Sequence, residues 1–533
     1  MRLPRLVTAC LLLTCAANAG AANGFTFSNP PGPYAVGLKV IQQYDRARTY
    51  KSEIDLATGE PVQGERARPV QTLVWYPAAR GGKPVTWRDY LDTVPTEDAF
   101  TRNPAEIKRM TDERIDGNAA GHREALLRDI ARPQLAVRDA RAENATMGAK
   151  FPVVIYAPSY SAYAVENTDL CELLASHGYI VLSSPSLGAH TRSMTTDLEG
   201  VEAQAADIAF LIGYAATLPQ ADTGKVAAVG FSWGGLANVF AAAKDARIKA
   251  LVSLDGSVRS FPKLVDGGKD AAPYVTPARV ALPMLFVGSR PRTMEALNRS
   301  ENMRTDYSFM NEMKYSDVYI VSMLPMKHAD FSSYYLRIES DEGFSAASDY
   351  SRDDINLQHS WAARYTLRFL DAYLKGDSAG LAFINNTPAA NGAPAHTMVT
   401  DIRRHKGSVP PTQESFVRRL AAAGFDQAIP EYDRFAAQNP AFKLGENEIF
   451  GWGVELAQRA RPLQAREIFR LGTHLYPDKS FMFDGLGEMQ AKTGQAGEAL
   501  ASYRRVLELD PNNADAIRYV KEHGTNAPGA SAP

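Results

Sequence analysis

The stretch Val226-Ala-Ala-Val-Gly-Phe-Ser-Trp-Gly-Gly235 carries the clearest structural signal in the chain. It begins as a buried strand, turns sharply between Gly230 and Gly234, and continues into an Ala-rich run that predicts a helix over residues 236–244. A serine with a glycine two positions before it and another two positions after it, between strand and helix, is typical of a nucleophile elbow. A Cβ at either glycine would collide with the strand or the helix, and the strained turn lifts the Ser232 hydroxyl clear of the backbone. We therefore expect an exposed, reactive hydroxyl here; the alternative is a Gly-Ser turn without chemistry.

Length and composition set the outer limits. A chain of 533 residues is too long for one ordinary core, so two or three domains are expected. The chain is 45% hydrophobic and 22% charged, with a formal net charge of −2, as in a soluble globular protein. Because there is no basic excess, no nucleic-acid partner or anionic membrane surface is expected.

The first twenty residues have the pattern of a targeting segment. Arg2 and Arg5 precede an apolar run over residues 6–15, and Ala17-Asn18-Ala19 fits a cleavage site between small residues. The apolar run is too short to cross a bilayer. We therefore predict a signal peptide over residues 1–20 and an exported protein, periplasmic or secreted, with no transmembrane segment in the mature chain.

The three cysteines agree with that organisation. Cys10 and Cys15 lie in the predicted signal, which leaves Cys171 alone and predicts a mature chain without an internal disulfide. Lipoprotein anchoring at Cys15 is disfavoured, because Thr14 replaces the small residue normally found there. Cys171 lies in an apolar helical pattern and is expected to be a small core residue.

Strands and helices alternate through a first domain assigned to residues 21–376. The expected strands cover residues 37–44, 69–76, 152–157, 179–183, 226–229, 248–254, 281–287 and 317–324. The expected helices cover residues 166–177, 202–216, 236–244 and 357–374. This alternation predicts an α/β fold, with a mostly parallel sheet and helices on both faces.

One segment interrupts the alternation and another follows it. Residues 84–148 are polar and helix-rich, which predicts a helical insertion over the sheet that acts either as a lid or as a solvated decoration. Residues 377–413 are rich in Ala, Asn, Gly and Pro and are predicted to form a linker.

A repeat follows the predicted linker. Small, aromatic and proline positions recur 34 residues apart, as Gly453, Ala465, Phe469 and Pro477, and then as Gly487, Ala499, Tyr503 and Pro511. A degenerate earlier copy keeps the internal spacing at Ala428, Tyr432 and Pro440. The period is that of tetratricopeptide repeats, so residues 414–523 are predicted to form a small all-α repeat domain, and residues 524–533 a disordered tail.

The chemistry around Ser232 needs a base and an acid. In this architecture the acid and then the histidine follow the serine in the chain, each at the carboxyl end of a later strand. His328 lies in a short loop after the strand over residues 317–324 and is the predicted base. Asp255 ends the strand over residues 248–254 and is the predicted acid, with Asp330 as the alternative because it is close to His328 in sequence.

An acyl transfer also needs two backbone N–H donors for the developing oxyanion. Trp233 follows the serine directly and is one expected donor. The other is expected from the loop after residues 152–157, at Tyr160, whose ring can instead form a wall of the acyl pocket. No cofactor or metal is expected, since no His, Asp or Glu cluster has ligand spacing.

Four stretches together carry a family resemblance: Leu174-Ala-Ser-His-Gly-Tyr-Ile-Val181, the Gly-Phe-Ser-Trp-Gly-Gly elbow, Ser253-Leu-Asp255 and His328-Ala-Asp-Phe331. Residues 34–376 thereby resemble the platelet-activating-factor acetylhydrolase and dienelactone-hydrolase-like branch of the α/β-hydrolases. In the acetylhydrolases the acid also follows the strand after the elbow, which favours Asp255. The chain departs from the family at the oxyanion loop, where Pro158-Ser-Tyr-Ser161 replaces His-Gly-x-Gly. Dienelactone hydrolase proper uses a cysteine nucleophile, and the serine in this chain favours hydrolysis of ordinary carboxylic esters.

The sequence therefore predicts an exported serine esterase that acts on a small-molecule ester through an acyl-serine intermediate. A serine peptidase of the prolyl-oligopeptidase type is a rival, although its acid follows a later strand and a propeller precedes its catalytic region. A non-catalytic binding protein that uses the repeats is the other rival. The repeats imply a protein or peptide partner, unless they dock on the first domain.

Overall fold

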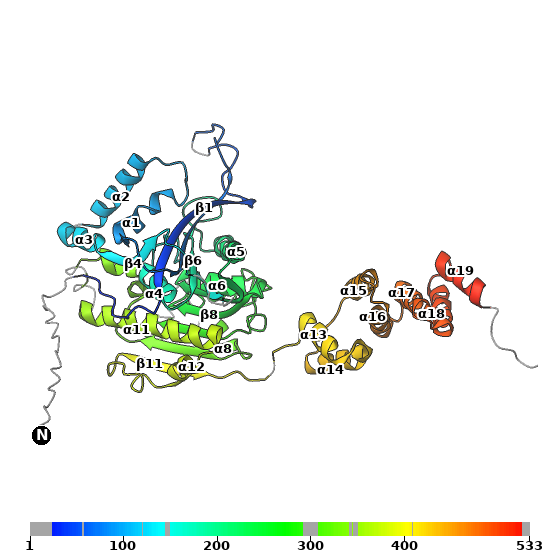
Figure 1. Ribbon diagram of the computed structural model, residues 1–533. Coiled ribbons are helices and arrows are strands. Elements are labelled where there is room, and N and C mark those ends of the chain that lie inside the picture. Colours follow the sequence, from blue (N-terminus) through cyan, green and yellow to red (C-terminus); the bar gives the residue numbers. More distant parts are fainter. Residues whose placement is uncertain are drawn as a thin grey trace, which may run out of the picture. The chain divides into compact units, whose positions relative to one another are not determined.

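The computed structural model describes residues 24–55, 58–119, 121–143, 150–291, 307–340, 344, 350–407 and 409–524. The predicted signal peptide lies outside these residues, as does the predicted tail apart from Gly524. The chain divides into two compact units, the first ending at Gly407 and the second following it (Figure 1). Within the described residues, no helix combines the length and the apolar character needed to cross a membrane.

The first unit is built on one mixed sheet whose strands lie in the order β11-β10-β9-β8-β7-β5-β6-β2-β1-β4-β3. Its centre is parallel from β6 to β10, whereas β2 joins β6, β1 joins β2 and β11 joins β10 in antiparallel fashion. The strands are β1 Ala35–Thr49, β2 Ala67–Ala78, β3 Pro84–Thr86, β4 Pro133–Arg138, β5 Phe151–Ala157, β6 Ile180–Ser183, β7 Ala221–Phe231, β8 Ile248–Leu254, β9 Met284–Gly288, β10 Val318–Met323 and β11 Met398–Arg403.

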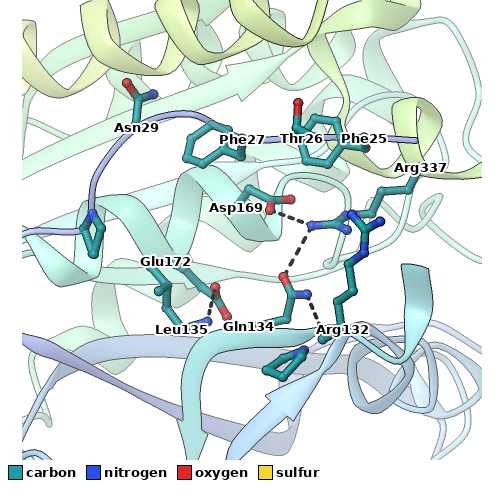
Figure 2. Close-up of a pocket in the computed structure, with 12 residues that line it drawn as sticks. Phe25, Thr26, Phe27, Asn29, Arg132, Gln134, Leu135, Asp169, Glu172 and Arg337 are labelled. Atoms are coloured by element: carbon teal, nitrogen blue, oxygen red, sulfur yellow. Dashed lines mark hydrogen bonds and ion pairs between the residues drawn. The ribbon is translucent and has the colours of Figure 1, made fainter. Parts of the chain in front are cut away.

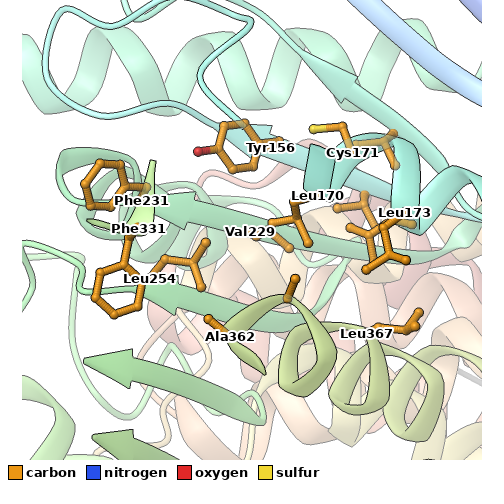
Figure 3. Packing of buried hydrophobic residues seen from close by; sticks show 14 of the residues in the cluster. Tyr156, Leu170, Cys171, Leu173, Val229, Phe231, Leu254, Phe331, Ala362 and Leu367 are labelled. Atoms are coloured by element: carbon orange, nitrogen blue, oxygen red, sulfur yellow. The ribbon is translucent and has the colours of Figure 1, made fainter. Parts of the chain in front are cut away.

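Successive residues of the central strands enter opposite cores, as the period of two in a strand requires. Val154 and Val229 pack with α4 (Thr168–Ser176) and α11 (Arg352–Leu370) on one face, as Figure 3 shows for the residues around Val229. Their neighbours in sequence pack on the other face, against α5 (Leu198–Ala215) and α6 (Trp233–Lys244). Cys171 lies inside the first core, in contact with apolar side chains. The fold class predicted from the sequence is therefore the observed one.

The insertion over residues 84–148 is packed on the sheet and also extends it. It contains α1 (Trp87–Leu91), α2 (Pro104–Asn118) and α3 (Arg123–Ile130), in which Trp87, Tyr90, Ile115 and Leu126 are buried. It also contains β3 and β4, and β4 pairs in parallel with β1. The segment predicted as a helix-rich insertion therefore contains two short strands in addition to its helices. Residues 120 and 144–149 lie outside the description.

The predicted linker over residues 377–413 also differs from the structure. Most of it belongs to the first unit, as α12 (Ser378–Asn385) and the edge strand β11. β11 pairs with β10 from Met398 opposite Met323 to Arg403 opposite Val318. The Gly and Pro residues that suggested a linker lie in the loop between these two elements. This composition hides the short alternating pattern of the strand that follows the loop.

The second unit consists of helices in its described residues. They are α13 Gln413–Ala423, α14 Ala428–Gln438, α15 Glu446–Gln458, α16 Pro462–Leu475, α17 Ser480–Lys492, α18 Ala496–Leu509 and α19 Ala514–His523. The recurring glycines face the recurring aromatic rings: a Cβ on Gly453 would lie 2.6 Å from the Phe469 ring, and one on Gly487 would lie 3.1 Å from the Tyr503 ring. The small residues at these positions therefore allow neighbouring helices to approach closely.

We expect β11 to be required for a stable first unit. A chain that ends at Thr397 keeps α12 but loses the edge pairing of β10 and the burial of Met398, whereas a chain that ends at Gly407 keeps all three. Burial of one large apolar side chain contributes about 2 kcal/mol, so in a unit of this size the shorter chain should melt about 2–4 °C below the longer one. Thermal unfolding followed by circular dichroism measures this difference. Equal melting temperatures would show that β11 adds nothing to the sheet.

Candidate active site

Ser232 occupies the sharp turn between β7 and α6. Its backbone has φ 52° and ψ −118°, a strained conformation for a residue with a side chain. Three backbone hydrogen bonds hold it: the Ser232 N–H donates to Leu254 O at 3.0 Å, and its carbonyl accepts from Gly235 at 3.0 Å and from Ser257 at 2.8 Å. The turn is thereby fixed to the end of β8 and to the loop that follows β8.

The glycines of the elbow lie where backbones pass too closely for a Cβ. A Cβ on Gly230 would lie 2.5 Å from the carbonyl oxygen of Gly234. A Cβ on Gly234 would lie 2.7 Å from Pro158 O and nearer still to Ala157 O, in the chain that leaves β5. The close approach expected from the sequence is therefore present, and it brings the loop after β5 beside Ser232.

The structure brings His328 to the serine and Asp255 to His328. The Nε2 atom of His328 lies 2.9 Å from Ser232 Oγ, and its Nδ1 atom lies 2.7 Å from Asp255 Oδ2. An ionised carboxylate can only accept hydrogen bonds, so Nδ1 carries the proton and Nε2 is free to accept from the serine hydroxyl. The imidazole is 47% exposed, which leaves this face of the site open to a ligand.

Asp255 follows the end of β8 and is largely buried. Its backbone has a φ of 42°, its N–H donates to Val287 O at 2.7 Å, and its Oδ1 accepts from the Ser289 N–H at 2.9 Å. Burial alone would raise the pKa of Asp255, but the hydrogen bonds from His328 and Ser289 and the charge on His328 hold it below its ordinary value. The carboxylate is therefore charged and oriented when it meets the imidazole.

Asp330, the alternative acid, has another partner. Its Oδ2 accepts from the Lys327 N–H at 2.7 Å and so caps the short helix His328–Phe331. Its own carbonyl oxygen lies 3.0 Å from Nδ1 of the buried His359. Asp330 thus shapes the loop that carries His328, and the structure places Asp255, not Asp330, on the imidazole.

The two expected oxyanion donors belong to the two chain segments that meet at Gly234. Trp233 is the first residue of α6, so its N–H has no acceptor within the helix. Tyr160 lies in the loop after β5, in which the N–H of Ser159 is bonded to Glu166 and that of Ala162 to Ser159 O. Among the described residues, neither Trp233 N–H nor Tyr160 N–H donates a hydrogen bond, which leaves both for a ligand.

The ring of Tyr160 packs beside the elbow. Its centroid lies 6.0 Å from that of the Trp233 ring, edge to face, and its hydroxyl donates to Met194 O. The side chain is nevertheless 43% exposed. It can therefore contact a ligand bound at Ser232 as well as brace the loop.

Sequence reasoning missed one buried acid behind the site. Glu166 lies between β5 and α4, and its carboxylate accepts hydrogen bonds from the backbone and the hydroxyl of Ser159. Burial raises the pKa of Glu166 to about 7. No pattern in its neighbourhood marks it, because an isolated glutamate at a helix start ordinarily indicates a solvated cap.

A pocket of about 460 Å³ lies elsewhere, between the segment that leads into β1 and the start of α4 (Figure 2). Its polar floor is an ion-pair network in which Arg337 bonds Asp129 at 3.0 Å and Asp169 at 2.6 Å. Glu172 lines the same pocket. The network joins α9 (Ser333–Ile338) to α3 and α4, and so anchors the chain just beyond the His328 loop.

Among the described residues, no group of three His, Cys, Asp or Glu side chains is placed to hold a metal ion. The polar groups that meet at the site are the hydroxyl of Ser232, the imidazole of His328 and the carboxylate of Asp255. Such an arrangement can activate the serine for attack on a carbonyl carbon.

The parallel sheet with helices on both faces and the serine turn between β7 and α6 define an α/β-hydrolase fold. Residues 126–331 match the family model of X-Pro dipeptidyl-peptidase (S15 family), a segment that includes Ser232, Asp255 and His328. The chain is also similar to the solved structure of a ferulic acid esterase from Streptomyces cinnamoneus, with 17% identity and a TM-score of 0.42, over 71% of this chain and 99% of that one. No curated protein matches this chain.

We expect Gly234→Ala to disrupt the elbow. The added methyl group would meet two backbone carbonyl oxygens that cannot move without shifting β5, so we expect a loss of about 2–3 kcal/mol in the free energy of unfolding. Gly213→Ala is the control, because a Cβ there meets no atom within 4 Å in the helix α5, and it should stabilise by about 0.5–1 kcal/mol. Denaturant unfolding measures both. Equal effects of the two substitutions would contradict the close approach at Gly234.

Proposed function

We propose that this protein is a serine hydrolase of carboxylic esters, with Ser232 as nucleophile, His328 as general base and acid, and Asp255 as the acid that orients His328. The single observation that carries the proposal is the unbroken hydrogen-bonded chain from Ser232 Oγ through His328 to Asp255, built from the ends of three strands. The match to a peptidase family over this segment supports hydrolytic chemistry in general.

In the first half of the reaction, Ser232 Oγ attacks the ester carbonyl carbon while its proton passes to Nε2 of His328. The charge of the imidazolium is balanced by Asp255, which keeps the Nδ1 proton directed at its Oδ2. The carbonyl oxygen becomes an oxyanion and accepts from the N–H groups of Trp233 and Tyr160. Collapse of this intermediate breaks the bond to the alkoxy oxygen, which leaves as the alcohol with the proton from Nε2.

In the second half, water takes the place of the alcohol. His328 Nε2 removes a proton from the water as its oxygen attacks the acyl carbon, and the same two N–H groups hold the new oxyanion. The bond to Ser232 Oγ then breaks, the serine regains its proton from Nε2, and the carboxylic acid leaves. No redox change or external co-reactant is required.

The choice of esters is supported by the position of the acid. Asp255 follows β8, the strand next after the elbow strand β7, which is the arrangement that made the sequence resemble the acetylhydrolases. Dienelactone hydrolase uses a cysteine nucleophile, and the serine of this chain favours hydrolysis of ordinary carboxylic esters over hydrolysis of dienelactones. Membership of this finer group is therefore part of the proposal.

A peptidase is the second candidate, and the family match favours it. The matched model describes an X-Pro dipeptidyl-peptidase, and residues 126–331 contain all three catalytic candidates. An amide differs from an ester in its poorer leaving group, so the same serine, imidazole and carboxylate serve either substrate if the leaving nitrogen can be protonated. Substrate comparison must therefore decide between the two.

For the remainder of the chain we propose export by the predicted signal peptide to the periplasm or the exterior. We also propose that the second unit consists of tetratricopeptide repeats that bind a protein or peptide. The repeat assignment is supported by the close packing of Gly453 on Phe469 and of Gly487 on Tyr503, at corresponding positions 34 residues apart. A non-catalytic binding role for the whole protein is the outcome if the serine proves inert.

A paired substrate assay tests the proposed function. Chromogenic esters of graded acyl length and Xaa-Pro amides of the same chromophore are hydrolysed in parallel by the wild type and by Ser232→Ala. We expect ester hydrolysis by the wild type that falls by about 10⁴-fold or more in the variant, together with loss of fluorophosphonate labelling. Faster hydrolysis of the amides would show a peptidase instead of an esterase. A folded wild type that is not labelled by the fluorophosphonate would contradict both activities.

The identity of the acid has its own test. Asp255→Asn keeps the shape of the side chain but cannot stabilise the imidazolium, so we expect kcat to fall about 10³–10⁴-fold. Asp330→Asn is the matched control: it alters a loop cap and should change kcat by no more than about tenfold. Steady-state kinetics with the best ester measure both. A larger loss in Asp330→Asn than in Asp255→Asn would reverse the assignment.

A further inference from the structure

The segment Glu166-Asn167 lies behind the candidate site and contacts both of its halves. Glu166 is 2% exposed and its carboxylate accepts three hydrogen bonds, from Ser159 N at 2.8 Å, from Ser159 Oγ at 2.5 Å and from Tyr156 Oη at 3.2 Å. These bonds hold both the backbone and the side chain of Ser159, the residue directly before Tyr160. Glu166 therefore holds the loop from which the proposed oxyanion donor comes.

The same two residues hold the segment that carries His328. The Glu166 carbonyl oxygen accepts from Tyr334 N at 3.0 Å, and the Asn167 side-chain oxygen accepts from Ser333 N at 2.8 Å. The Asn167 amide donates to Phe331 O at 2.9 Å and to Tyr156 Oη at 2.6 Å. Asn167, Tyr156 and Glu166 thus form one continuous chain of buried hydrogen bonds between the oxyanion loop and the histidine loop.

We propose that Glu166 is a positioning residue for the reaction at Ser232, holding the Ser159–Tyr160 loop in register with the His328 loop and placing a negative charge behind the imidazole. The inference rests on the proposed function, since it concerns a step that occurs only if Ser232 is a nucleophile. Glu166 does not touch the substrate. It acts through the Tyr160 amide and through the field at His328.

The charge on Glu166 varies in the working range of such an enzyme. Burial raises the pKa of Glu166 to about 7, and the hydrogen bonds from Ser159 and Tyr156 and the charge of His328 oppose that rise. The titratable groups that face it are Tyr156 on β5, His328 after β10 and Tyr335 on α9. Burial raises the pKa of both tyrosines, so they stay neutral, and ionised Glu166 favours the imidazolium that forms during acyl transfer.

The protonation of Glu166 makes kcat depend on pH. Above its pKa, Glu166 is ionised, accepts all three hydrogen bonds and stabilises the charged His328. As the pH falls through about 7 it takes up a proton and both effects weaken. Wild-type kcat should therefore have an added loss on the acid side that a variant without this carboxylate lacks.

Glu172 offers a matched control on α4. It is also 2% exposed, burial likewise raises its pKa to about 7, and it also accepts three hydrogen bonds, from Tyr90 Oη, Leu135 N and Ala136 N. It lines the pocket of Figure 2, and its partners lie in the insertion and not in the loops of the site. The two substitutions therefore impose the same chemical change at two places.

The experiment measures kcat and KM for the best ester from pH 5.5 to 9 in the wild type, Glu166→Gln and Glu172→Gln. For Glu166→Gln we expect kcat at pH 8.5 to fall about 10–100-fold with KM within about threefold, and the ratio of wild-type to variant kcat to shrink toward pH 6. For Glu172→Gln we expect kcat and its pH profile to follow the wild type, whatever happens to the melting temperature.

Equal effects of the two substitutions, or a ratio for Glu166→Gln that does not change with pH, would overturn the positioning role. Should Glu166→Gln fail to fold, Ser159→Ala tests the same contact from the other side, since it removes the 2.5 Å bond and keeps the backbone amide. It should lower kcat about 3–30-fold with KM little changed, and wild-type kcat would overturn the proposal. An inactive wild type would instead refute the proposed function.

Discussion

The close passage of three backbones at Ser232 is the constraint on which the first unit depends. Gly234 lies against the chain that leaves β5, and the carbonyl of Ser232 accepts from the loop that follows β8. Because β5, β7 and β8 are adjacent and parallel, these contacts bring the loop after β5, Ser232 and Asp255 together at the carboxyl ends of these strands. The strained backbone of Ser232, at φ 52°, is held by these contacts and by its three backbone hydrogen bonds.

The elements that repeat a pattern could be predicted, and the isolated ones could not. The strand, turn and helix around Ser232 follow from glycine placement and hydrophobic periodicity, and His328 and Asp255 follow from their positions after later strands. The roles assigned to these side chains remain predictions, although the structure brings the three together. Glu166 has no such signal, because its importance comes from partners at residues 156, 159 and 328, which only the fold brings near.

The strands at the edges of the sheet also could not be predicted from the sequence. β11 has six residues and follows a Gly- and Pro-containing loop, so its alternation was too short to stand out from a linker composition. β3 and β4 lie in a polar stretch with strong helix signals. β4 pairs with β1, which is distant in sequence, and β3 pairs with β4, and local propensity does not predict these long-range pairings. In the second unit the 34-residue spacing could be recognised because the same residue types recur at it. The structure places its glycines, Gly453 and Gly487, against the rings of Phe469 and Tyr503, where neighbouring helices pack closely.

Cys171, which lies on α4 among apolar side chains, has a consequence for how the first unit responds to reductants. It is the only cysteine among the described residues, and burial foremost raises the pKa of its thiol well above the usual value. A protonated, enclosed sulfur is a poor partner for oxidants and for thiol exchange. Among the described residues no disulfide links two parts of the chain, so the described fold is held by packing and hydrogen bonds, and a reductant has no cross-link there to break.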